Sequence, residues 1–164
     1  MIDKIEEKIE EPDAGLWEFR ETSQIHCYSS LFHWAGSQAA MKIASYFGDE
    51  AIIQQAQRLI QRAEELIEAC YDPEAQVYRQ AIGGTDLDAS LLQLITMKYL
   101  DPYSEKARNH LAKLEEELMT RDGLFYRYKH KDDFGEPEST FLVCAFWYVD
   151  ALACVGRLAD ANLR

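Results

Sequence analysis

The feature that most constrains this sequence is the helical spacing of its apolar residues, which recurs along most of its 164 positions. Within residues 50–71, for example, Ile52, Ala56, Leu59 and Ala63 fall every three or four positions and share one helix face. The same spacing predicts further helices over residues 2–11, 28–47, 89–100, 104–121 and 140–158. Strand patterns are brief, at residues 76–80 and 124–128, and indicate hairpin pieces inside loops. We therefore predict an all-α fold with short β-like turns in its loops.

Two of the predicted helices carry information beyond their spacing. The last one, residues 140–158, is apolar on almost every side, and a helix of that kind is normally buried between neighbours. Asp88 stands immediately before the helix predicted at 89–100, in the position of an N-cap. We interpret the Asp88 carboxylate as a helix cap and not as a ligand.

A turn motif occurs three times along the chain. It runs from Asp13 to Arg20, recurs more loosely from Asp72 to Arg79, and recurs again from Asp122 to Arg127. Each copy is an Asp-led turn, an aromatic segment and an arginine, followed by a new helix. The copies begin 59 and 50 residues apart, which leaves room for two antiparallel helices per unit. The sequence thus predicts an array of helical hairpins, with one helix in its third unit.

Corresponding loops of a helical-hairpin array emerge at the same end of the assembly. We therefore expect the three aromatic loops to line one rim and to expose Trp17, Tyr78, Phe125, Tyr126 and Tyr128. Aromatic rings beside arginines and carboxylates suit sugar rings, whose apolar faces stack while their hydroxyls form hydrogen bonds. The alternative is that these aromatics only pack the loops onto the helix ends, and the repeat by itself leaves both interpretations open.

Charge and cysteine content narrow the class of protein. Twenty-nine acidic residues against seventeen Lys plus Arg give a net charge of −12, so we expect no nucleic-acid or membrane partner. No apolar run is long enough for a membrane helix and the N-terminus is charged, which favours a cytoplasmic protein. The cysteines lack metal-ligand spacing and are interpreted as structural thiols, and we expect no metal or cofactor. They are Cys27, Cys70, Cys144 and Cys154.

Three segments, in order, resemble glycoside hydrolase family 15, the glucoamylase and trehalase-like family. GLWEFR at residues 15–20, followed by HCYSS at 26–30 and Trp34, resembles the Trp-Glu loop of the family. GGTDLDAS at residues 83–90 resembles its Asp-Ala-Ser helix start. GEPESTF at residues 135–141, followed by CAFW at 144–147, resembles its Glu-Gly-x-Phe segment and the Phe-Trp helix behind it. The resemblance extends over about 150 residues.

This resemblance implies helical hairpins of the (α/α)6-toroid type and a pair of catalytic glutamates. By motif position the general acid is Glu18 and the general base is Glu138. Glu136 is a near neighbour of the base, and only the Glu-x-x-Phe spacing to Phe141 selects Glu138. The family is of the inverting kind, so the two carboxylates should lie roughly 6.5–9.5 Å apart to admit a water molecule.

Four further residues are candidates for substrate binding: Trp17 and Tyr126 in the aromatic loops, and Arg20 and His26 near Glu18 in the sequence. Arg20 could instead pair with a neighbouring glutamate, and His26 could be a packed histidine at a helix start. The sequence departs from the family pattern at residue 21, where Glu replaces an expected Gly, and at Pro137, which stiffens the approach to Glu138.

Because the chain is shorter than a complete barrel, two hypotheses of function remain. Six hairpins of about 55 residues need roughly 330, so residues 1–164 correspond to one partial barrel domain, the C-terminal half of the catalytic domain. One hypothesis is a hydrolase of α-glucosides or oligosaccharides, or a truncated or split portion of one, weak or inactive alone. The alternative is a non-catalytic helical-repeat interaction module. Its unpaired apolar helix edge would favour self-association or binding of a complementing N-terminal half.

Overall fold

The structure is a computed structural model that describes residues 1–20, 22–132 and 135–163. The fold is all-α, as predicted, with one short hairpin of paired strands. Within these ranges no helix is long and apolar enough to cross a membrane. The helices are α1 (Ile2–Lys8), α2 (Cys27–Phe47), α3 (Glu50–Glu68), the 3-10 helix η1 (Ala89–Leu92), α4 (Gln93–Thr96), α5 (Glu105–Leu118), α6 (Leu142–Cys154) and α7 (Leu158–Ala161). The strands are β1 (Tyr71–Asp72) and β2 (Val77–Tyr78), which pair antiparallel.

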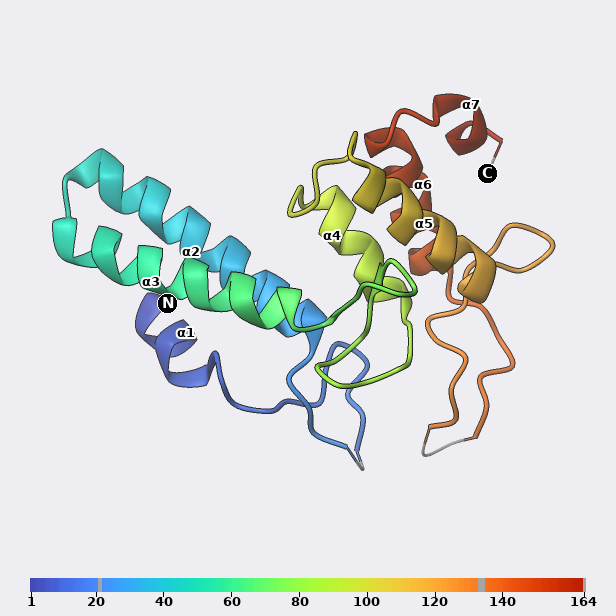
Figure 1. The fold of residues 1–164 in the computed structure, drawn as a ribbon, viewed down its shortest axis with the longest axis horizontal. Coiled ribbons are helices and arrows are strands. Elements are labelled where there is room, and N and C mark those ends of the chain that lie inside the picture. The colour runs from blue at the N-terminus through green and yellow to red at the C-terminus, as the bar shows by residue number, and fades with distance from the viewer. Residues whose placement is uncertain (21, 133–134, 164) are drawn as a thin grey trace.

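Helices α2 and α3 form the first complete hairpin, lying side by side in Figure 1. Gly48 ends α2 in the left-handed conformation at φ 71°, and Asp49 then caps α3 by accepting the Ile52 N–H at 3.2 Å. The apolar face of α3 packs with α1 and α2 in a core of their own, which contains Ile5, Ala40, Ala56, Leu59 and Ala63. The helical spacing of residues 50–71 therefore identified the buried face correctly.

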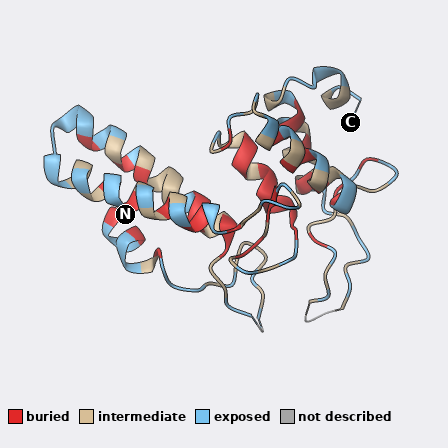
Figure 2. Cartoon of the chain, in the orientation of Figure 1, coloured by how far each residue is buried: buried red, intermediate tan, exposed pale blue. Residues whose placement is uncertain are grey.

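The main core lies where the ends of α2 and α3 meet η1, α4, α5 and α6 (Figure 2). Its largest fully buried side chains include Tyr78, Phe125 and Tyr148. Three cysteines are buried and Cys154 is partly buried, and all four are free thiols, in agreement with a structural role. Burial raises the pKa of the Cys144 thiol to about 12, which keeps it protonated and unreactive.

The helices predicted at 89–100 and 140–158 were too long, for identifiable reasons. The segment predicted at 89–100 is only η1 followed by α4, because Lys98 adopts a positive φ of 61° and ends the helix. The Lys98 N–H then donates to the Ile95 carbonyl at 3.0 Å and the Leu100 N–H to the Leu94 carbonyl at 2.9 Å, which closes the turn. The segment predicted at 140–158 stops at Cys154, because Gly156 at φ 81° reverses the chain before α7 begins.

Helix α6 is not buried on every side, contrary to the expectation. Cys144, Tyr148 and Leu152 face the core, whereas Leu142 and Phe146 are 62% and 63% exposed. The strand predicted at 124–128 is also wrong in extent. Residues of that segment form isolated bridges, Met119 with Phe125 and Asp88 with Tyr128, and no continuous ladder.

The loops that contain the three Asp-led turns gather at one end of the helices, as the repeat predicts (Figure 1). Their aromatic residues do not all face solvent, however. Tyr78, Phe125 and Tyr128 are at most 2% exposed, so the prediction of an exposed rim is wrong for these three. Tyr78 donates a hydrogen bond to Glu68 at 2.5 Å, and Phe125 stacks on Tyr148 at 4.6 Å between ring centroids. These rings pack the loops onto the helices, whereas Trp17 and Tyr126 remain half-buried.

Candidate active site

Glu18 lies at an exposed turn at the loop end of the molecule. The Phe19 N–H donates to the Ala14 carbonyl at 2.9 Å, and paired backbone hydrogen bonds between Asp13 and Gln24 close the base of the loop. Glu18 itself has a positive φ of 55°, a conformation that strains a residue with a side chain. Such strain is commonly found where a side chain must be aimed for function.

The acid turn, defined here as residues 14–19, is held from beneath by Asp13 and His26. The Asp13 Oδ1 accepts the Gly15 N–H at 2.5 Å and lies 3.1 Å from His26 Nδ1. Burial acts to raise the pKa of Asp13, but the hydrogen bonds from His26 and Gly15 outweigh it and hold the pKa below its usual value. His26 is only 2% exposed and stacks beneath Phe19. It therefore occupies the packed position, the second of the two alternatives considered for it.

Trp17 connects the acid turn to the segment that carries Glu138. Its ring lies 6.2 Å, between centroids, from the rings of Tyr128, Phe141 and Trp147. Phe141 immediately precedes α6 and Trp147 lies within it, so the segment just before α6 is brought against the acid turn. Aromatic contacts of this kind contribute about 0.5–1.5 kcal/mol each beyond the area they bury.

Asp88 is a buried carboxylate that lies close to Trp17. It is 3% exposed and accepts the Ser90 N–H at 2.8 Å and the Ser90 hydroxyl, which confirms the predicted helix cap. Burial raises the pKa of the Asp88 carboxyl above its usual value, and the Ser90 hydrogen bonds and the nearby Trp17 indole oppose that effect. The indole N–H of Trp17 is close to Asp88 without forming a hydrogen bond of ordinary geometry.

Glu138 lies at the edge of a hollow of about 540 Å³, called here the base hollow. Arg127, Asp132, Glu136 and Phe141 also line it. The Arg127 guanidinium lies 3.3 Å from the Asp132 carboxylate and 4.7 Å from the centre of the Tyr128 ring. The base hollow therefore presents carboxylates and one cation beside an aromatic wall, which suits a polar ring with hydroxyl groups.

The structure brings some of the residues proposed from sequence together and leaves others apart. Trp17 and Glu18 share one turn, and that turn meets the segment containing Glu138. Arg20 is exposed, and Tyr126 is half-buried with Lys129 Nζ 5.4 Å from its ring centre, outside the base hollow. Sequence reasoning missed Arg127, although a signal was present: it is the arginine that ends the third copy of the turn motif.

Substituting Gly15 should destabilise the fold more than substituting an equivalent glycine elsewhere. Gly15 has φ 67°, and a Cβ there would lie 2.9 Å from two ring atoms of His26. Gly83 has φ 72° with nothing within 4 Å of a Cβ, so a substitution there is destabilising only through the strained backbone conformation. We expect Gly15→Ala to lower the free energy of unfolding by about 1–3 kcal/mol beyond Gly83→Ala. Equal losses in urea denaturation would show that His26 does not pack against the turn.

Helical hairpins whose loops gather at one end, around carboxylates, define an all-α architecture found among glycosidases. Two solved structures superpose on 98% of this chain and 42% of their own. They are a glycosidase variant in complex with glucose, with a TM-score of 0.84, and a second glycosidase variant, with a TM-score of 0.82, both 18% identical in sequence. The expected helical hairpins of the (α/α)6-toroid type are thereby confirmed.

The chain belongs to glycosyl hydrolases family 15, whose family model matches residues 1–163. Among curated proteins it is similar to the trehalase of Thermoplasma volcanium, with 32% identity over 163 residues, covering 99% of this chain and 26% of that enzyme. It is also similar to the trehalase of Mycobacterium tuberculosis, with 33% identity over 166 residues, covering 97% and 24%. The chain thus spans about a quarter of the length of these relatives.

Proposed function

We propose that this chain carries both catalytic carboxylates of an inverting hydrolase of α-glucosidic bonds, with Glu18 as general acid and Glu138 as general base. The observation that carries the proposal is the contact of Trp17 with Phe141, which joins the two glutamate-bearing segments at one end of the helices. Family membership over residues 1–163 supports the same reaction class.

Inverting hydrolysis requires a different role from each of the two carboxylates. The acid must protonate the leaving oxygen, and Glu18 is carried on a strained turn whose backbone is tied down by Asp13. The base must activate a water molecule on the other side of the sugar, and Glu138 borders a hollow with room for one. We expect the carboxylates to lie roughly 6.5–9.5 Å apart, and a separation above about 12 Å in a crystal structure would exclude this mechanism.

We propose trehalose as the first substrate to test. The similar curated proteins from Thermoplasma and Mycobacterium carry the name trehalase. Arg127 and Asp132, in the base hollow, supply a donor and an acceptor suited to glucose hydroxyls. Trp17, beside the acid, offers an aromatic ring that is only partly buried.

A non-catalytic interaction module remains a second candidate, favoured by one observation. Phe141, Leu142 and Phe146 are 49%, 62% and 63% exposed along one side of the start of α6. Large apolar side chains exposed close together in this way are typical of an interface. Under this alternative the chain self-associates or binds a complementing half, and its glutamates serve no reaction.

The test compares two proteins. One is the 164-residue chain, and the other is a chimera in which the chain replaces the matched segment of the Thermoplasma volcanium trehalase. Correct positioning of substrate can contribute about 7–11 kcal/mol, so we expect little or no turnover of trehalose by the chain and measurable turnover by the chimera. A chimera that is folded by circular dichroism but inactive on trehalose, maltose and starch would favour the interaction module. Rapid turnover by the chain alone would contradict the expected need for further positioning residues.

A further inference from the structure

Asp88 lies where the loops of the candidate site meet, although the mechanism above gives it no role. Its backbone forms a bridge with Tyr128, and the N–H of Ala89 donates to the Arg127 carbonyl at 2.8 Å. These contacts join the start of η1 to a loop that lines the base hollow. The Asp88 side chain, which caps η1 through Ser90, is therefore held at a fixed place beside the site.

Trp17 brings an unpaired hydrogen-bond donor to the same place. Its Nε1 is buried, and among the described residues it has no hydrogen-bond partner. Burial raises the pKa of the Asp88 carboxyl, and the neighbouring Trp17 indole opposes that effect, as an N–H that favours the charged form does. Buried donors are nearly always paired in folded proteins, so the indole N–H needs an acceptor.

Asp88 has an oxygen available for this donor. The N–H and the hydroxyl of Ser90 both donate to Oδ1, so the helix cap does not engage Oδ2. An ionised carboxylate accepts hydrogen bonds at both of its oxygens. Because Asp88 is only 3% exposed, water competes little for the second one. A donor and an acceptor thus lie close together, each without another use.

The orientation of Trp17 affects the acid directly, because the two residues are adjacent in the chain. Glu18 is exposed, so its placement depends on the residues on either side. Trp17 and Phe19 both pack on Tyr128, with ring centroids 6.2 and 5.2 Å from it. Ring packing alone fixes an orientation loosely, whereas a hydrogen bond to a charged acceptor adds geometric specificity.

We infer that Asp88 is a positioning residue for the acid: its Oδ2 accepts the indole N–H of Trp17 and thereby holds Trp17, and Glu18 beside it, in one orientation. The role of Glu18 as general acid rests on the proposed function, but the hydrogen bond between Trp17 and Asp88 does not. A residue that only capped η1 would leave the acid turn unaffected.

The main experiment is NMR of the ¹⁵N-labelled 164-residue chain, with the Trp17 indole signal assigned by its absence in Trp17→Phe. Asparagine caps a helix about as well as aspartate, so Asp88→Asn should keep the contact with Ser90. Its amide nitrogen takes the place of Oδ2 and cannot accept the indole N–H. We expect the Trp17 indole proton to move upfield in Asp88→Asn, and the backbone signals of Glu18 and Phe19 to shift with it.

Two controls separate this effect from a loss of structure. The indole of Trp34 donates to Glu64 at 3.1 Å, and its signal should stay in place in Asp88→Asn. Ser90→Ala removes the hydroxyl that donates to Oδ1 and leaves Oδ2 unchanged. This variant should disturb the signals of η1 without moving the Trp17 indole.

Kinetics of the chimera give a second readout. Asp88→Asn should lower kcat on trehalose about tenfold or more, the ratio expected for the loss of one hydrogen bond to a charged group. The loss should be smaller on α-glucosyl fluoride, whose leaving group needs little protonation. Equal losses on the two substrates would contradict a role exerted through Glu18.

The NMR outcome is independent of whether the chimera hydrolyses trehalose. A Trp17 indole signal that moves in Asp88→Asn but not in Ser90→Ala supports the inference. A signal that stays in place, or that moves equally in both variants, overturns it. If Asp88→Asn does not fold, a crystal structure of the wild type decides: Trp17 Nε1 and Asp88 Oδ2 within about 3.5 Å support the hydrogen bond, and a longer separation overturns it.

Discussion

Replacing Glu18 or Glu138 with glutamine is expected to lower the kcat of the chimera on trehalose by about 10²–10⁴-fold in each case. Glutamine keeps the size and hydrogen-bonding capacity of the side chain but can neither donate nor accept a proton at neutral pH. The loss should therefore appear in kcat, with a much smaller change in KM. Steady-state kinetics of the two variants measure both quantities.

Glu136→Gln is the matched control for the base. Glu136 lines the same hollow as Glu138 and is also exposed, but it lies two residues earlier, outside the Glu-x-x-Phe spacing. Its substitution should leave kcat within a few-fold of the parent chimera. A large loss with Glu136→Gln and none with Glu138→Gln would move the base assignment to Glu136.

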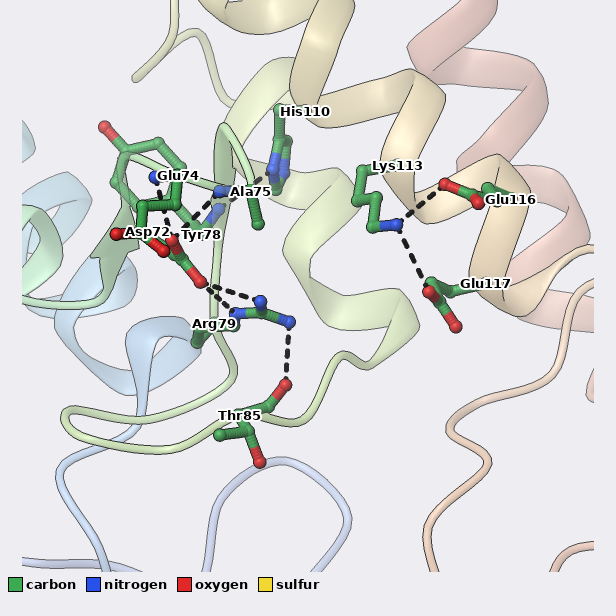
Figure 3. A network of polar contacts seen from close by, with 10 residues as sticks. All are labelled: Asp72, Glu74, Ala75, Tyr78, Arg79, Thr85, His110, Lys113, Glu116 and Glu117. Carbon is green, nitrogen blue, oxygen red and sulfur yellow. Dashed lines mark hydrogen bonds and ion pairs between the residues drawn. The ribbon is translucent and has the colours of Figure 1, made fainter.

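The stability of the 164-residue chain should fall by about 3 kcal/mol between pH 7 and pH 4 through His110 alone. His110 is fully buried, and burial is the main cause that lowers its pKa from 6.5 to about 4. The geometry gives the same direction independently: the Tyr78 N–H donates to Nδ1 at 3.3 Å (Figure 3), so Nδ1 needs its lone pair. The Nε2 atom lies 3.0 Å from the Leu91 carbonyl. Lys106, a nearby cation, acts in the same direction.

The sign follows from proton binding. Between pH 4 and 6.5 the unfolded chain binds a proton at residue 110 and the folded chain does not, so acid favours unfolding. The stabilisation is complete above pH 6.5 and is lost as the pH falls toward 4. Urea denaturation of wild type and His110→Gln at several pH values isolates this contribution from that of the carboxylates. His110→Gln should be less stable at pH 7 but should show a flatter dependence on pH; parallel curves would contradict a neutral buried His110.

Much of the helical architecture was predictable because local spacing determines which helix face is buried. The face of α3 and the caps Asp49, Asp88 and Ser104 depend on residues a few positions apart. The repeated Asp-led turn predicted that the loops share one end, since corresponding loops of a hairpin array lie together. Asp13 and Asp72 each accept backbone N–H groups two or three residues ahead, so the turns themselves are determined locally.

The features that could not be predicted depend on contacts between residues that are distant in sequence. The Tyr78 ring packs in the main core and Glu68 accepts its hydroxyl, and Tyr148 donates to Glu115, 33 residues away. No local pattern distinguishes such aromatics from exposed ones. The same holds for the candidate site: the motifs proposed Glu18 and Glu138 as candidates, but the Arg127–Asp132 pair emerges only when separate loops are brought together.

The central claim, that Glu18 is the acid and Glu138 the base, is tested most directly by changing the leaving group. Hydrolysis of α-glucosyl fluoride needs a base to activate water but little protonation of the departing fluoride, whereas hydrolysis of trehalose needs both. In the chimera, Glu18→Gln should retain most of its activity on the fluoride while losing its activity on trehalose, and Glu138→Gln should lose both. Equal losses of the two variants on α-glucosyl fluoride, or the reverse pattern, would contradict these roles.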